Sequence, residues 1–310
     1  MKIMFMGTPE IAATTLRALL SAGLPVTSAV TGQDKPRGRG GNMTPTAVKS
    51  LALSEGLKVY TPDSLRTEEF MEILRGEEPD LIVVVAYGKI LPKAVLDFPR
   101  LGCINLHVSL LPKYRGAAPM QRAVMNGERE TGVTVMYMDV GLDTGDIIRA
   151  ERFPIGPSDD FEYVHDTSAE IGGRLLASVI RDMEAGIFTR TPQDHSLATY
   201  ADKIEKADCR VDFSLPAEVV SARIRGVTPI PGAFAYLGGK MLKIFGVSAT
   251  GGRGRPGEVI SLDSRGEGSI TVACGEGAIR VLGVIPEGKG RMTAGDFVRG
   301  RKIQVGDILE

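Results

Sequence analysis

The chain has 310 residues, 43% of them hydrophobic and 24% charged, with a formal net charge of −1 at pH 7. This length and a mean hydropathy of +0.03 predict a soluble globular protein with two domain cores. The apolar runs, such as Leu81–Ala86, are too short to cross a bilayer, and Met1–Gly7 leads into a strand without a cleavage site, so we expect a cytoplasmic protein. An odd number of scattered cysteines argues against disulfides and zinc; they are Cys103, Cys209 and Cys274.

The first two thirds of the chain alternate strand-like and helix-like segments. Thr8 suits an N-cap and Pro9 the first helical position of a helix that runs to about Ala22. Other expected helices are 46–55, 68–76, 119–126 and 160–185, and the expected strands are 2–6, 26–31, 81–86 and 103–107. This order predicts a mostly parallel sheet with right-handed crossovers. Segments 132–139 and 147–153 are expected to form a hairpin at its edge.

The composition changes after the long helix. We expect a catalytic domain over 1–188, a polar linker over 189–207 and a second domain over 208–310. Short runs separated by glycine predict a small β-barrel of the OB type; they are 233–237, 241–247, 258–262, 269–273 and 278–285, after a helix at 217–225. From Lys206 to Glu310 there are 15 Lys and Arg against 11 Asp and Glu, a balance that permits contact with a polyanion.

The turn after the first strand argues against a dinucleotide enzyme. Gly7–Glu10 lacks the G-x-G-x-x-G pattern, and Pro9 removes a backbone donor where a pyrophosphate would bind. We therefore do not expect NAD.

Two segments, Gly102–Pro112 and Gly141–Asp146, hold the residue types of an active site. Side chains alternate along a strand, so Asn105 and His107 are expected on one face. If the strand is parallel and internal, its carboxyl end opens onto the crevice where such sheets bind ligands. Asp143 adds a carboxylate in a turn flanked by glycines.

Each of these residues also has an ordinary structural interpretation. A histidine beside an apolar run is more often a satisfied core or surface residue, Asp143 suits a tight turn, and Asn105 could bond a loop backbone. The combination with Ser109–Pro112 and Tyr114–Gly116 favours a functional site.

Motifs of one kind run through almost the whole chain: Gly7–Glu10, Asp34–Gly40 with Thr44 and Pro45, Val84–Gly88, Ile104–Pro119, Gly132–Asp146, Tyr200–Ile204 and Pro231–Ala233. Together they resemble the methionyl-tRNA formyltransferase family, one branch of the folate-dependent formyltransferases. In that resemblance Asn105, His107 and Ser109–Pro112 indicate the chemistry. The basic loop Lys35–Gly41 and the C-terminal domain indicate the substrate.

The resemblance implies a Rossmann-like catalytic domain and transfer of a formyl group from 10-formyltetrahydrofolate to the α-amino group of methionyl initiator tRNA, for translation initiation. Asn105, and His107 when protonated, would donate hydrogen bonds to the tetrahedral oxyanion. Asp143 would either hold the imidazole or accept the proton of the attacking amine, and the sequence leaves both roles open. No metal is needed.

The same resemblance assigns the two binding regions. The folate site would be lined by Ser109, Leu110, Leu111 and Pro112, with a pterin pocket shaped by Val85, Ala86, Tyr87 and Gly88. A flexible basic loop would insert at the acceptor end of the tRNA through Lys35, Arg37 and Arg39. The resemblance implies no membrane and no obligate protein partner.

Three other functions remain open from the sequence. The chain could formylate another amine, such as an amino sugar or purine precursor, or it could hydrolyse the folate and release formate. It could also be a noncatalytic RNA-binding protein that keeps the fold. The basic loop and C-terminal domain argue against the first two, and the intact Asn105, His107 and Asp143 set argues against the third.

Overall fold

The computed structural model describes residues 1–37 and 41–310. Two compact units are each assembled from several segments. Unit 1 contains Met1–Gly116, Gly132–Phe153 and His165–Tyr200, and unit 2 contains Ala117–Thr131, Pro154–Val164 and Ala201–Glu310. The domain limits expected from the sequence, 1–188 and 208–310 with a linker between them, stay predictions.

The core of unit 1 is a seven-stranded sheet with the order β10-β9-β7-β6-β1-β2-β5. Its strands are β1 (Ile3–Gly7), β2 (Val26–Val30), β5 (Lys58–Tyr60), β6 (Leu81–Val85), β7 (Cys103–His107), β9 (Glu130–Tyr137) and β10 (Ile147–Pro154). β1 runs parallel to β2 and β6, and β6 runs parallel to β7, whereas β7 and β9 are antiparallel. The mostly parallel sheet is confirmed, and β10 forms its edge beside β9, where the expected hairpin lies.

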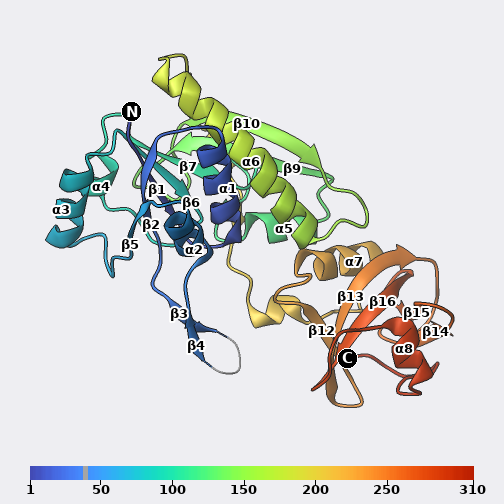
Figure 1. Cartoon of the computed structure of the whole chain (residues 1–310). Helices are drawn as coiled ribbons and strands as arrows, with labels where there is room; N and C mark the ends of the chain where they lie inside the picture. The colour runs from blue at the N-terminus through green and yellow to red at the C-terminus, as the bar shows by residue number, and fades with distance from the viewer. Residues whose placement is uncertain (38–40) are drawn as a thin grey trace. The chain divides into compact units, whose positions relative to one another are not determined.

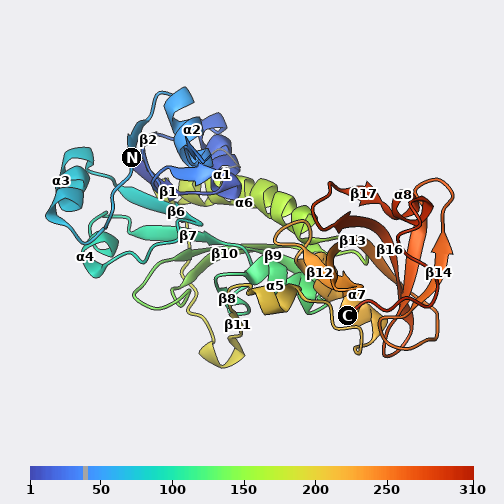
Figure 2. The same ribbon diagram turned by 90° about the horizontal axis from the view of Figure 1, so that it is seen from below.

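Helices cover both faces of this sheet (Figures 1 and 2). One face carries α1 (Glu10–Ser21), α2 (Ala47–Ser54) and α6 (Phe161–Glu184), and the other carries α3 (Glu68–Glu77) and α4 (Lys93–Leu96). None of the helices in the described parts of the chain is long and apolar enough to cross a membrane.

Alternation along the strands divides the core of unit 1 in two. Ile3 and Phe5 of β1 pack with α1 and α6, while the intervening methionines pack with α3. Ile104 and Leu106 of β7 belong to the same cluster as Ile3, so the side chains of Asn105 and His107 lie on the opposite face. Hydrophobic burial on one face thus fixes which face of β7 carries the polar groups.

The start of α1 differs from the expectation. The N-cap is Pro9, whose ψ of −176° is extended, and the helix begins at Glu10. Thr8 lies outside the helix and its Oγ1 donates to the carbonyl oxygen of Tyr87 at 3.3 Å. The prediction of Thr8 as N-cap and Pro9 as first helical residue was therefore wrong by one position, because the extended Pro9 carbonyl already accepts from Ala12 and Ala13.

Unit 2 has a separate antiparallel sheet with the order β12-β13-β16-β15-β14, to which β17 adds beside β16. Its strands are β12 (Ala233–Leu237), β13 (Lys240–Thr250), β14 (Val259–Asp263), β15 (Ser269–Ala273), β16 (Ala278–Pro286) and β17 (Met292–Thr293). α7 (Ala217–Gly226) packs on β13 and on α5 (Pro119–Met125), and α8 (Ala294–Arg299) packs on β15 and β16. A separate β domain after the first is confirmed, and its sheet is antiparallel; the OB-like barrel stays a prediction.

Candidate active site

The carboxyl-terminal half of β7 presents the first two predicted catalytic residues. Asn105 is half-buried and His107 is buried, with an exposed fraction of 5%. Among the residues that the structure describes, the side-chain amide of Asn105 has no hydrogen-bond partner. Its N–H groups are therefore available to a substrate.

The ring of His107 is held on both sides. Nε2 lies 3.0 Å from the carbonyl oxygen of Tyr114, and Nδ1 lies 3.6 Å from Oδ2 of Asp143. A carbonyl only accepts hydrogen bonds, so the first contact places a proton on Nε2 and leaves Nδ1 to face the carboxylate. The structure thus brings His107 and Asp143 together, although they are far apart in the sequence.

Asp143 sits in a strained turn between β9 and β10. Its φ of 53° is left-handed, a conformation that costs a non-glycine residue of order 1–3 kcal/mol. Oδ2 accepts a hydrogen bond from the backbone N–H of Gly116 at 2.8 Å, whereas Oδ1 has no partner within the described residues. A Cβ at Gly145 would collide with the carbonyl oxygen of Tyr137, so the turn requires glycine there.

The predicted pterin-pocket residues follow β6, the parallel neighbour of β7. Ala86 and Gly88 have positive φ values of 45° and 80°, so the chain turns sharply where the strand ends. Because Val84 pairs with Asn105 in register, this turn lies at the same end of the sheet as the polar residues of β7. Tyr87 is buried, and burial raises the pKa of its hydroxyl to about 12.

The predicted folate residues after β7 form a loop that is bound to its own surroundings. The Ser109 hydroxyl is 2.6 Å from the Lys113 carbonyl oxygen, to which it donates. The Thr134 hydroxyl donates to the Ser109 carbonyl at 2.7 Å and accepts from the Leu111 N–H at 3.2 Å. Leu111 is buried, while Leu110 and Pro112 are half-buried. Ser109 therefore shapes the loop through its hydroxyl, and the contact of these residues with a folate stays a prediction.

The predicted tRNA loop contains strands that the sequence did not suggest. Lys35 and Arg37 lie in β3 (Lys35–Arg37), which pairs antiparallel with β4 (Asn42–Thr44). Lys35 is exposed. Arg39 lies outside the described residues. The expected loop is therefore a short hairpin over its described ends.

Sequence reasoning missed two buried polar residues beside the Asp143 turn. Arg115 has an exposed fraction of 2%, and Gln193, from the expected linker, has 6%. The Gln193 amide bonds both Arg115 and the turn. Arg115 stood in a motif of interest, but no sequence signal connects it with Gln193, which is 78 residues away.

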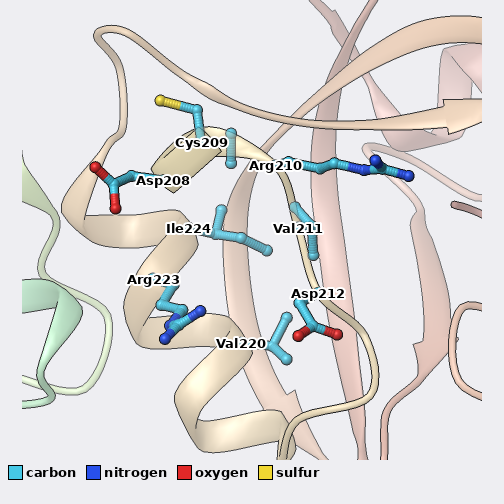
Figure 3. Close-up of a pocket in the computed structure, with 9 residues that line it drawn as sticks. Asp208, Cys209, Arg210, Val211, Asp212, Val220, Arg223 and Ile224 are labelled. Carbon is cyan, nitrogen blue, oxygen red and sulfur yellow. The ribbon is translucent and has the colours of Figure 1, made fainter. Parts of the chain in front are cut away.

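Unit 2 carries a small pocket of its own (Figure 3). Arg210 and Arg223 at this pocket form no ion pair with the residues described, although the charge of Arg223 acts on the nearby Asp208 and Asp212 and Arg210 lies over the ring of Tyr236. Asp208 is paired with Arg122 at 2.9 Å. The hydrogen bonds from Arg122 lower the pKa of Asp208. The pocket is lined by Asp208, Cys209, Arg210, Val211, Asp212, Val220, Arg223, Ile224 and Ala233. Across residues 1–37 and 41–310, no group of three or more His, Cys, Asp or Glu side chains could hold a metal ion.

An amide and an imidazole on one face of β7, with a carboxylate beside the imidazole, are groups that suit acyl transfer. A model of formyl transferases matches residues 1–180, and a model of the C-terminal domain of formyl transferases matches residues 203–302. The chain therefore belongs to the formyl transferase family.

Relatives that match the whole chain indicate one branch of this family. The methionyl-tRNA formyltransferase of Citrifermentans bemidjiense is 46% identical over 309 residues, which cover 100% of this chain and 96% of that protein.

Solved structures share the fold at lower identity. An N-formyltransferase from Helicobacter canadensis, in complex with folinic acid and dTDP-3-aminofucose, has a TM-score of 0.66 and 19% identity over 91% of this chain and 98% of that chain. HypX from Aquifex aeolicus, in complex with tetrahydrofolic acid, has a TM-score of 0.65 and 19% identity over 97% of this chain. The match covers only 47% of HypX, so this chain spans about half its length.

Proposed function

We propose that the chain transfers the formyl group of 10-formyltetrahydrofolate to the α-amino group of methionyl initiator tRNA. The observation that carries this proposal is the 46% identity, over the full length, to a methionyl-tRNA formyltransferase. The juxtaposition of His107 and Asp143 beside the unpaired amide of Asn105 supports the chemistry. We place the reaction in the cytoplasm, where initiator tRNA is used.

The reaction needs a donor for the developing negative charge. The neutral amine attacks the formyl carbon, a C–N bond forms, and the formyl oxygen becomes an oxyanion in the tetrahedral intermediate. Asn105 is suited to donate to this oxygen, because no residue that the structure describes occupies its amide. Such a donor stabilises the intermediate more strongly than the ground state.

The reaction also needs an acceptor for the proton of the attacking nitrogen. Oδ2 of Asp143 is bound to Gly116, and Oδ1 is the oxygen left to accept that proton. When Nδ1 also carries a proton, it would face the same carboxylate at 3.6 Å, and the positive charge of His107 would stabilise the oxyanion. The intermediate then collapses: the bond from the formyl carbon to N10 of the folate breaks, and N10 takes up a proton.

The folate cosubstrate would occupy the end of the sheet where β6 and β7 finish. The turn at Ala86–Gly88 and the loop at Ser109–Pro112 both leave from this end, and each follows a strand that is fixed in the core. We therefore place the ring of the folate at this end of the sheet, beside Asn105.

The tRNA would bind through basic residues in both units. Lys35, Arg37 and Arg39 would contact its acceptor end. Arg210 and Arg223 form no close ion pair within the described residues of unit 2, and their guanidinium groups are suited to bind phosphates.

The direct test is transfer of labelled formyl from 10-formyltetrahydrofolate to methionyl initiator tRNA, beside methionyl elongator tRNA and a reaction without tRNA. We expect label on the initiator tRNA alone. Formate release without labelled tRNA would show that the chain hydrolyses the folate, which contradicts the proposal. An absence of folate turnover would contradict it as well.

A further inference from the structure

The buried side-chain amide of Gln193 is hydrogen-bonded to the backbone of the turn that carries Asp143. Nε2 of Gln193 donates to the carbonyl oxygens of Asp143 at 2.9 Å and Gly145 at 2.7 Å. Its Oε1 accepts from Nε and Nη2 of Arg115 at 3.2 and 2.6 Å. Since carbonyls only accept and a guanidinium only donates, these partners fix the orientation of the amide without ambiguity.

Arg115 is the anchor behind this amide. It is buried, and among the described residues no carboxylate pairs with it; Nη2 also lies 3.1 Å from Nδ1 of His195, which must act as the acceptor. A charged donor on Oε1 polarises the amide of Gln193 and strengthens the hydrogen bonds that its N–H groups donate. The charge of Arg115 is therefore directed, through Gln193, at the backbone of the turn.

Two consecutive residues, Arg115 and Gly116, hold different groups of Asp143. The N–H of Gly116 binds the carboxylate at 2.8 Å, and the side chain of Arg115 reaches the backbone carbonyl of the same residue through Gln193. The carboxylate and the main chain of Asp143 are therefore both held by the segment Arg115–Gly116.

The other contacts of the turn lie mainly at its ends, where the N–H of Tyr137 donates to the carbonyl oxygen of Asp146 at 2.9 Å and Arg190 pairs with Asp146 at 3.2 Å. The apolar side chains of the turn point outward, since Val140 is 78% and Leu142 is 60% exposed, and Asp143 itself has a left-handed backbone. Asp139 accepts two bonds within the turn, so at Asp143 itself the hydrogen bonds from Gly116 and Gln193 are the ones that maintain its shape.

We propose that Gln193, anchored by Arg115, is a positioning residue that holds the Asp143 carboxylate at the distance from His107 that formyl transfer requires. This inference rests on the proposed function for its chemistry. Gln193 touches the main chain of the turn, so it acts through Asp143. A displacement of about 1 Å in a catalytic group can cost about 100-fold in rate, so we expect kcat to fall about 10- to 100-fold when the amide is lost.

Two variants separate positioning from general support of the fold. Gln193→Leu removes every hydrogen bond at similar volume. Gln193→Glu keeps an acceptor for Arg115, with which it would form a new buried ion pair, but it loses both donors to the turn. Gln304→Leu makes the same chemical change at an exposed position and serves as the matched control.

The measurements are kcat and KM for both substrates, together with hydrogen exchange of the backbone amides over 139–146. We expect both Gln193 variants to lower kcat about 10- to 100-fold with KM values within about threefold, and to exchange faster over the turn. Gln304→Leu should match the wild type in both respects.

A Glu variant with wild-type kcat, or unchanged exchange over 139–146 in both Gln193 variants, would overturn the inference. A wild-type enzyme without transfer to methionyl-tRNA would instead overturn the proposed function and the catalytic role with it. Hydrogen exchange reads the turn without catalysis, so the two failures are distinguishable.

Discussion

Replacement of Asn105 by alanine separates catalysis from stability. The amide has no hydrogen-bond partner among the described residues, so its removal strands no protein donor or acceptor, and Ile104 and Leu106 keep their places in the opposite core. We expect the free energy of unfolding to change by less than about 1 kcal/mol, which is a fall in Tm of no more than about 4 °C.

The effect on rate should be far larger. Loss of one oxyanion donor costs about 10²- to 10³-fold in kcat, or about 2.7–4 kcal/mol in transition-state stabilisation. Because the interaction is made in the transition state, kcat and kcat/KM should fall together while KM changes little. Asn105→Asp, which is almost the same size, should be slower still, because it places a carboxylate against the developing oxyanion.

The assay is steady-state transfer of labelled formyl to methionyl initiator tRNA over a range of concentrations of both substrates, which gives kcat and KM, with Tm measured on the same preparations. Asn126→Ala, at an exposed position after α5, is the control for loss of an asparagine amide and should retain the wild-type rate. An Asn105→Ala enzyme within threefold of the wild type would refute the assignment of this amide as the oxyanion donor.

Other changes test the remaining parts of the structure. The double variant Lys35→Ala with Arg37→Ala should raise KM for the tRNA and lower the salt dependence of that KM by a slope of about 1 for each phosphate that the variant no longer binds, with KM for the folate unchanged; equal salt slopes would contradict this role. Gly145→Ala should destabilise the protein by about 1–3 kcal/mol in chemical denaturation and lower kcat, because a Cβ there would collide with a backbone carbonyl of β9; a fully active, stable variant would contradict it. Arg122→Met should lower Tm near neutral pH. The pKa of Asp208 is lowered in the folded protein, so the stabilisation is complete above the ordinary pKa of an aspartate and is lost as the pH falls through the lowered value. The difference in Tm should therefore narrow as the pH is lowered from about 5 towards 3. A constant difference would show that Arg122 acts through packing and its hydrogen bonds to the carbonyl oxygens of Asp202 and Lys203, and not through the charge of Asp208.

The strands and helices that the sequence predicted are those with strong apolar patterns. Ile3–Gly7 and Leu81–Val85 are buried throughout, so continuous apolar runs marked them as internal parallel strands. β5 at Lys58–Tyr60 was missed because it has only three residues and none of them is fully buried. The hairpin of β3 and β4 was missed because its strands have no alternating apolar pattern and the sequence between them is glycine and arginine. Only the pairing of the two strands reveals it.

The same distinction holds within the candidate site. Alternation along one strand suffices to place Asn105 and His107 on one face, because the intervening residues are drawn into the core. Asp143 could be proposed from its motif, but its contact with His107 depends on how the turn between β9 and β10 folds back. Gln193 could not be predicted: it lies 50 residues from Asp143 in a polar segment, and its importance comes from long-range contacts with Arg115 and the turn.

The site therefore joins a rigid part to a part that depends on polar contacts. Asn105 and His107 are fixed by a strand whose other face is buried, so hydrophobic burial already determines their positions. Asp143 stands in a turn with exposed apolar side chains, and its position relative to His107 is set by a few hydrogen bonds from Gly116 and Gln193. Polar bonds of this kind are directional, so they can hold a carboxylate to within a fraction of an ångström without a hydrophobic core beneath it. Mutations in the core of the sheet should consequently reduce stability first, whereas mutations around the turn should reduce kcat first.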